Sequence, residues 1–239
     1  MSRGRRVAIT GVGVVCPLGI QPDRVMDAIV AGRSGIAPLD RFPTEGFEIR
    51  AAAQVRGFSL GDHLDGPEAD FLVGKEDLKT ELGLAACELA LRDAHGDEPP
   101  AGVPSGARGL FLATGLGSNV VSETEEDFLP HIDARGGFDY GGAGRTVGTA
   151  DSPYRWRHLS DLAVHLTAGR HGIAGPVVTN YSACAAGAIS IGQAFREVRA
   201  GRLDHALAGG FESMIHPFGV LSFQLLGALS ESERPVEEI

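Results

Sequence analysis

Residues 177–190 read VVTNYSACAAGAIS, and this stretch decides the fold class. Its first part, Val177–Asn180, is apolar and rich in β-branched residues, which is typical of a buried strand. Residues 185–200 have apolar positions at helical spacing and small residues at their start. A strand followed at once by a helix predicts a sharp turn between them. Cys184 lies in that turn.

The same alternation of strands and helices extends outward along the chain. Apolar runs followed by glycine-rich turns predict further strands, and amphipathic stretches predict helices. The predicted strands are residues 6–9, 109–113 and 206–209, and the predicted helices are residues 22–31, 79–95, 123–132 and 159–169. This order indicates an α/β fold. Because no Pro/Ser-rich linker interrupts the pattern, we expect residues 1–239 to form one domain.

Composition excludes several classes of function. The net charge of -10 disfavours binding to nucleic acid. The three cysteines, Cys16, Cys87 and Cys184, are far apart and form no C-x-x-C pair, so we expect neither a disulfide framework nor a zinc site. No cofactor motif is complete, and we expect no cofactor. These features favour a reducing, cytoplasmic setting.

The apolar N-terminal region does not resemble a membrane or export signal. Glycines and Pro17 interrupt it, and no convincing cleavage site of small residues follows. We interpret it as a buried strand, and no segment of the chain is long and apolar enough to cross a bilayer.

Cys184 is the principal candidate for chemistry. A thiol at the start of a helix faces free backbone N–H groups and the positive end of the helix dipole, which both favour the nucleophilic thiolate. The same N–H groups could hold the oxyanion of a tetrahedral intermediate. The alternative is a buried structural cysteine, the common role of a free thiol. Local spacing does not decide between the two.

Two glycine-rich turns and the histidines carry weaker signals. The stretch 11–16, GVGVVC, begins like a dinucleotide fingerprint but lacks its third glycine, so a tight turn is favoured. The stretch 114–118, TGLGS, is interpreted as a turn that ends a strand or lines a pocket. None of the eight histidines lies in a metal-binding motif. We expect His165 to pack within its helix and His171 to cap the end of that helix.

A series of short motifs occurs in an order that is far more specific than any of them alone. They are RVAITGVG with PLG at 6–19, AGRSGI at 31–36, DRF at 40–42, IAGP at 173–176, SACAAG at 182–187, AGGFE at 208–212 and ALS at 228–230. In this order they resemble the N-terminal half of the β-ketoacyl synthases of fatty-acid and polyketide synthesis, members of the thiolase-like superfamily.

The resemblance implies a fold and a set of roles. The family has two similar halves in a five-layered αβαβα architecture, and this chain is similar to the first half. Cys184 would accept the acyl group, and its backbone N–H would form half of the oxyanion hole. Phe223 and Leu116 would lie beside the acyl pocket. The presence of cysteine separates this chain from the chain-length-factor relatives, which have another residue there.

The resemblance also implies what lies outside this sequence. In the family, the second half supplies two catalytic histidines, one in an H-G-T-G-T motif, and a Gly-Phe-Gly loop, and neither motif occurs here. One hypothesis is therefore a ketosynthase portion that requires a C-terminal half. A second is a non-catalytic protein that binds acyl groups or carrier protein, or acts as a dimerisation partner. A third is a defunct fragment with an exposed apolar face.

The implied partners are an acyl carrier protein and either a second copy of the chain or a complementary half. An acidic carrier protein needs a basic surface. The densest basic cluster is Arg145, Arg155, Arg157 and His158. A solvated loop with no partner is the alternative interpretation of this cluster.

Overall fold

A computed structural model describes residues 5–96, 98, 100–115, 117, 121–146 and 159–230, with only the backbone for residues 121–124. The chain divides into two compact units. Unit 1 comprises residues 1–35, 53–115 and 161–212, and unit 2 comprises residues 36–52, 116–160 and 213–239. The candidate site and the principal sheet both belong to unit 1.

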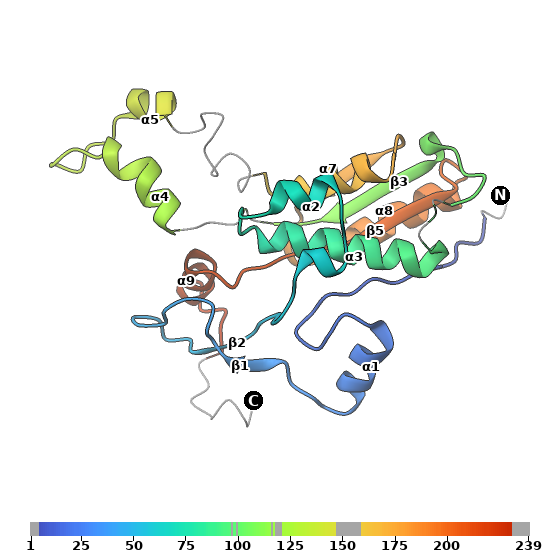
Figure 1. Cartoon of the computed structure of the whole chain (residues 1–239), viewed down its shortest axis with the longest axis horizontal. Coiled ribbons are helices and arrows are strands. Elements are labelled where there is room, and N and C mark those ends of the chain that lie inside the picture. The colour runs from blue at the N-terminus through green and yellow to red at the C-terminus, as the bar shows by residue number, and fades with distance from the viewer. Residues whose placement is uncertain are drawn as a thin grey trace. The chain divides into compact units, whose positions relative to one another are not determined.

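A parallel three-stranded sheet forms the centre of unit 1 (Figure 1). Its order is β4 (Val177–Asn180), β3 (Arg108–Ala113) and β5 (His205–Gly210). Ala113 is paired with Asn180 on one side and with Gly210 on the other. Because all three strands are parallel, their carboxyl ends meet at one edge of the sheet, where α/β proteins commonly bind ligands.

Helices cover both faces of this sheet (Figure 1). Leu110 and Leu112 of β3 pack against α3 (Leu78–His95) and α7 (Leu162–Arg170). Phe111, which points to the opposite face, packs in a cluster with Ala194 of α8 (Ala186–Arg199). This alternation of side chains along β3 is the period of two expected for a strand with both faces buried.

Shorter elements complete unit 1. Pro22 begins α1 and Pro67 begins α2, positions where the missing proline N–H costs nothing. Asp77 caps α3, since its side chain accepts hydrogen bonds from Thr80 N and Thr80 Oγ1. The bounds are α1 (Pro22–Val30), η1 (Leu60–Asp62), α2 (Pro67–Leu72), η2 (Ser105–Ala107) and η4 (Ala183–Ala185).

Unit 2 contains mainly short helices. Phe138 lies against Phe128 and Tyr140 in an aromatic cluster, and Asp139 accepts a hydrogen bond from Gly142 N at 2.9 Å. Strands β1 and β2 form a two-stranded sheet, and Ala53, the last residue of β2, is counted with unit 1. The bounds are β1 (Ile36–Pro38), β2 (Ala51–Ala53), α4 (Val121–Phe128), η3 (Leu129–His131), α5 (Tyr140–Thr146) and α9 (Pro217–Leu225).

The α/β prediction is confirmed, and so are the strands and helices predicted from residue 79 onward, with their ends shifted by a few residues. The strand predicted at residues 6–9 is wrong, because this segment pairs with no strand among the described residues and Ile9 is 85% exposed. It leads into Gly11 and Gly13, which lie directly against the backbone of α3. A Cβ added at Gly13 would lie 2.6 Å from Ala90 N. These glycines therefore allow the backbone of residues 11–13 to lie close to the backbone of α3. They do not form the tight turn that we predicted.

Candidate functional site

The turn around Cys184 is built by its neighbours in β4. Asn180 ends that strand and is buried at 8% exposure. Its backbone carbonyl accepts a hydrogen bond from Thr114 N at 3.2 Å, which ties the turn to β3. Its side-chain Oδ1 accepts one from Ser182 N at 2.8 Å, the contact of an Asx turn. Asn180 therefore positions the turn, a role that the sequence analysis missed although asparagine is a frequent turn residue.

The residue before Cys184 has a strained backbone. Ala183 has φ +48°, in the left-handed region that residues other than glycine seldom adopt. Such strain costs on the order of 1–3 kcal/mol and persists at functional sites, where the surrounding structure imposes it. The turn that it forms, η4, leads directly into α8. The structure thus places Cys184 on a sharp strand–turn–helix connection.

Cys184 is exposed, whereas the other two cysteines are more enclosed. Its exposure is inconsistent with the buried structural role that we left open. Cys87 has that role instead: it lies in the core between α3, α7 and the sheet, and burial raises the pKa of its thiol to about 12. Of the small residues around the turn, Ala186 is buried, whereas a Cβ added at Gly187 would meet no atom within 4 Å.

Replacing Ala183 with valine tests the strained turn. A β-branched side chain at φ +48° is disfavoured, so we expect Ala183→Val to lower the free energy of unfolding by about 1–3 kcal/mol. The matched control is Ala185→Val, since Ala185 is also exposed but has φ −89°. We expect this control to cost about 0.5 kcal/mol, the difference in helix propensity. Equal losses in urea unfolding of the two variants would contradict a strained Ala183.

Charged residues lie at the same edge of the sheet, beyond the ends of β3 and β5. Glu212 follows β5, and a Cβ at Gly115 would lie 2.7 Å from its Oε2. Lys79 of α3 is 1% exposed, and burial lowers its pKa although Glu212, Asp77 and Asp161 oppose the shift. The sequence analysis missed Lys79, because the apolar face of the helix gave no reason to expect a buried cation. Buried lysines with perturbed pKa values are frequent near functional sites.

The other predicted residues are placed as follows. Leu116, Arg155, Arg157 and His158 lie outside the described residues, and Arg145 lies in α5 of unit 2. Phe223 lies in α9 of unit 2 and is 39% exposed. Its role beside an acyl pocket stays a prediction.

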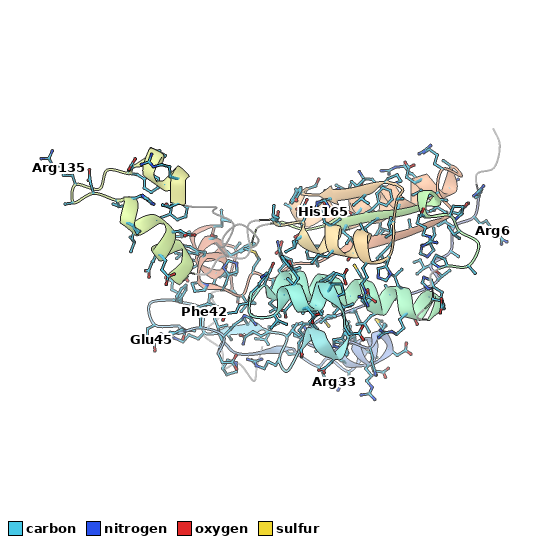
Figure 2. The ribbon with its side chains drawn as sticks, turned by 45° about the horizontal axis from the view of Figure 1, so that its top comes forward. Arg6, Arg33, Phe42, Glu45, Arg135 and His165 are labelled. Carbon is cyan, nitrogen blue, oxygen red and sulfur yellow. The ribbon has the colours of Figure 1, made fainter. Side chains whose placement is uncertain are left out.

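The predictions for the two histidines of α7 have different outcomes. The prediction that His165 packs within its helix is wrong: its side chain is 67% exposed, and its Nε2 lies 3.3 Å from Asp161 Oδ2. Figure 2 labels His165 on the ribbon. The prediction for His171 is confirmed, since it is the C-cap residue that directly follows Arg170, the last residue of α7.

Comparison with known proteins decides the family. Residues 4–237 match the family model described as "Beta-ketoacyl synthase, N-terminal domain". The chain belongs to the β-ketoacyl synthase family. The β-ketoacyl synthase resemblance that the ordered motifs indicated is therefore confirmed.

Curated β-ketoacyl synthase relatives share about three tenths of the residues with this chain. A 3-oxoacyl-[acyl-carrier-protein] synthase 2 of Staphylococcus aureus is 28% identical, with 100% of this chain and 54% of that protein covered. The tetracenomycin polyketide synthase ketoacyl synthase beta subunit of Streptomyces glaucescens is 30% identical, with 98% of this chain and 53% of that protein covered. The chain spans about half the length of the curated relatives that it matches.

Solved ketosynthase structures share the fold. A type II polyketide ketosynthase in complex with its acyl carrier protein has a TM-score of 0.71 and 26% identity, with 97% of this chain and 51% of that chain covered. A β-ketoacyl synthase from Burkholderia phymatum has a TM-score of 0.71 and 25% identity, with 93% of this chain and 50% of that chain covered. The thiolase-like α/β architecture, represented by its N-terminal half, is therefore confirmed.

The described part of the chain contains neither a membrane-spanning helix nor a cluster of metal-ligating side chains. No helix there has the length and hydropathy required to cross a membrane. No group of three or more His, Cys, Asp or Glu side chains there is arranged to hold a metal ion.

Proposed function

We propose that this chain is the nucleophile-bearing portion of a β-ketoacyl synthase, with residues 1–239 as its N-terminal domain, and that Cys184 accepts an acyl group from acyl carrier protein. The observation that carries the proposal is the strained Ala183, which presents an exposed Cys184 immediately before α8. Family membership and the solved complex of a ketosynthase with its carrier protein support the choice of acyl donor.

The first step is a thioester exchange at Cys184. The cysteine thiolate attacks the carbonyl carbon of the acyl thioester, forming a new C–S bond and a tetrahedral oxyanion. The backbone N–H of Cys184 donates to that oxyanion. When the intermediate collapses, the C–S bond to the carrier breaks, and the carrier thiolate takes a proton. The acyl group is then held as a thioester of Cys184.

The second step joins the acyl group to a malonyl thioester. Loss of CO2 from the malonyl group leaves an enolate, which attacks the acyl carbonyl and releases Cys184. The developing enolate charge needs hydrogen-bond donors at the malonyl carbonyl. In this proposal those donors are histidines from a complementary C-terminal half. We therefore expect this chain alone to form the acyl-cysteine but not to complete the condensation.

The surface of α8 supports a packing partner. One face of α8 is buried against the sheet through Ala186, Ser190 and Ala194. Away from that face, Ile191 is 54% exposed and Phe195 is 42% exposed. Exposed apolar side chains of this kind mark protein interfaces. We propose that a complementary half, or a second copy, covers them. The three free cysteines favour a reducing, cytoplasmic setting.

Intact-mass measurement after incubation with an acyl carrier protein thioester tests the proposal. We expect wild-type protein to gain the mass of one acyl group, and Cys184→Ala to gain none. The control is Cys16→Ala, which removes another thiol and should acylate like wild type. If wild-type protein gains no acyl mass, the chain is instead a non-catalytic relative that binds carrier protein or a partner. Acylation of Cys184→Ala would exclude Cys184 as the acceptor.

A further inference from the structure

A second candidate site lies at the other end of the sheet. A cavity of about 760 Å³ opens at the amino ends of β3 and β5, whereas Cys184 follows the carboxyl end of β4. Side chains from α3, the end of α7 and both strands line it, all of them in unit 1. Its volume is within the range of small-molecule sites in proteins. Nothing in the proposed acyl transfer uses this cavity.

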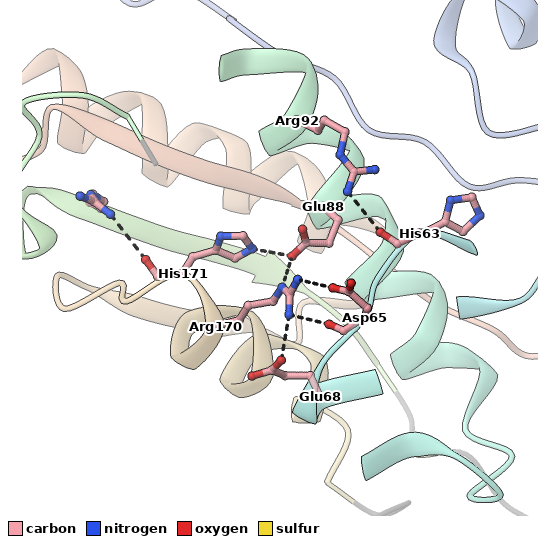
Figure 3. Close-up of polar contacts among 8 residues, drawn as sticks. His63, Asp65, Glu68, Glu88, Arg92, Arg170 and His171 are labelled. Carbon is pink, nitrogen blue, oxygen red and sulfur yellow. Dashed lines mark hydrogen bonds and ion pairs between the residues drawn. The ribbon is translucent and has the colours of Figure 1, made fainter. Parts of the chain in front are cut away.

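Some of the charges around the cavity neutralise one another (Figure 3). Arg170 donates to Glu88 Oε1 at 3.0 Å and to Glu68 Oε2 at 3.0 Å, and it also contacts Asp65. His171 Nε2 shares the same Glu88 oxygen. These side chains therefore already have partners of opposite charge. All of them except Glu68 line the cavity.

Arg108 differs, because its partners are uncharged. Its Nε and Nη2 donate to the carbonyl of Val103 at 3.0 and 2.7 Å, and Nη1 lies 3.5 Å from the carbonyl of His171. Within the described part of the chain, no carboxylate forms an ion pair with it. A partly buried guanidinium without a counter-ion is costly, and it attracts an anion.

Two histidines lie beside Arg108 at this end of the cavity. His205 is the register partner of Arg108 in the parallel sheet, so the two side chains lie next to each other on the face toward α3 and α7. The His95 ring, at the end of α3, is 5.8 Å from the His205 ring. Burial lowers the pKa of His205, and the charges of His95 and Arg108 add to the effect. An imidazole ring can donate a hydrogen bond to an anion through a ring N–H.

The state of the two ring nitrogens of His95 points to a ligand. Both of its nitrogen atoms are buried, and neither has a hydrogen-bond partner among the described residues. Buried polar atoms in folded proteins nearly always have a partner, so each exception requires an explanation. An acceptor atom of a bound molecule would satisfy the donor nitrogen of His95 and would neutralise Arg108 at the same time.

We propose that Arg108, His95 and His205 bind the oxyanion group of a small molecule, a phosphate or a carboxylate, in this cavity. Leu91, Ile173 and Leu207 also line the cavity and provide an apolar wall for the body of the molecule. The remaining charged groups at the cavity are Arg92 and the exposed Glu98. The site is independent of the acyl transfer proposed for Cys184, so either proposal can fail without the other.

Titration of the full chain with inorganic phosphate, and separately with acetate, tests the site. Binding is followed by calorimetry and by the NMR signals of the histidine ring protons. We expect at least one anion to bind saturably and to move the signals of His95 and His205 together. Binding of phosphate alone assigns a phosphate group, and binding of acetate alone assigns a carboxylate. If neither anion binds saturably up to about 100 mM, the proposal is overturned.

Two variants and a control keep the test decisive. We expect Arg108→Gln to weaken binding at least about tenfold. Because Arg108→Gln also removes hydrogen bonds to two backbone carbonyls, its effect on binding is checked with a second variant, His95→Phe. This variant keeps an aromatic ring and removes two nitrogens that have no hydrogen-bond partner among the described residues. We expect His95→Phe to retain or raise the thermal midpoint and to lose at least about tenfold in affinity. The control is Arg202→Gln, in an exposed pair with Glu197, which should bind like wild type. Wild-type affinity in His95→Phe and Arg108→Gln would overturn the proposal.

Discussion

Gly13→Ala is expected to lower the free energy of unfolding by about 3 kcal/mol or more, or to prevent folding. The added Cβ would overlap the carbonyl oxygen of Ala86 and would lie 2.6 Å from Ala90 N. Both are backbone atoms of α3, which cannot rotate away as a side chain can. The only relief is displacement of residues 11–13 from the helix, with loss of the packing between them.

Gly106→Ala is the matched control for this substitution. A Cβ at Gly106 meets no atom within 4 Å, and the residue has no positive φ. We expect the control to change stability by less than about 0.5 kcal/mol. Urea unfolding of both variants measures the difference. If Gly13→Ala is as stable as Gly106→Ala, the segment does not lie against α3 as the structure places it.

Glu88→Ala is expected to lower the free energy of unfolding by about 2–3 kcal/mol. Its carboxylate is nearly buried, at 10% side-chain exposure, and joins Arg170 of α7 and the following His171 to α3 (Figure 3). Truncation leaves those two side chains without their shared partner. The control is Glu197→Ala, whose partner Arg202 is exposed, and which should change the free energy of unfolding far less than Glu88→Ala does.

The pH dependence of the Glu88→Ala effect provides a second measurement. Burial by itself would raise the pKa of Glu88, but the hydrogen bond and charge of His171, together with Arg170, lower it below its ordinary 4.5. A group with a lower pKa in the folded state contributes stability above its unfolded pKa and loses that contribution as the pH falls through the folded value. We therefore expect the stability difference between wild type and Glu88→Ala to shrink below pH 4.5. A difference that grows on acidification would contradict this assignment.

Local pattern predicted most elements of unit 1 correctly because periodicity is a property of short segments. Alternation and helical spacing identified β3, β4 and β5 and the helices that cover them. The pattern failed at residues 6–9, which are as apolar as a strand. A strand also requires a neighbour for its backbone hydrogen bonds, and no local pattern shows whether one is available. Gly11 and Gly13 indicated that the backbone approaches another element closely, but they did not indicate which element.

The turn at Cys184 was predictable only in part. The order strand, small residues, helix placed a cysteine at the junction, and the ordered motifs indicated its family. Neither indicated that Ala183 has φ +48° or that the Asn180 side chain accepts the Ser182 N–H. Backbone strain results from the surrounding structure that imposes it, and so it is absent from the residue types themselves.

By itself, the sequence determined the α/β class, the position of Cys184 between strand and helix, and membership of the β-ketoacyl synthase family, because each depends on residues close together or on the order of motifs. Only the tertiary structure decided what Gly13 packs against, that His165 is exposed, and that Arg108, His95 and His205 meet at one cavity. These three side chains come from β3, α3 and β5, far apart in the chain. Strand register and helix packing bring them together, and both are properties of the folded chain as a whole.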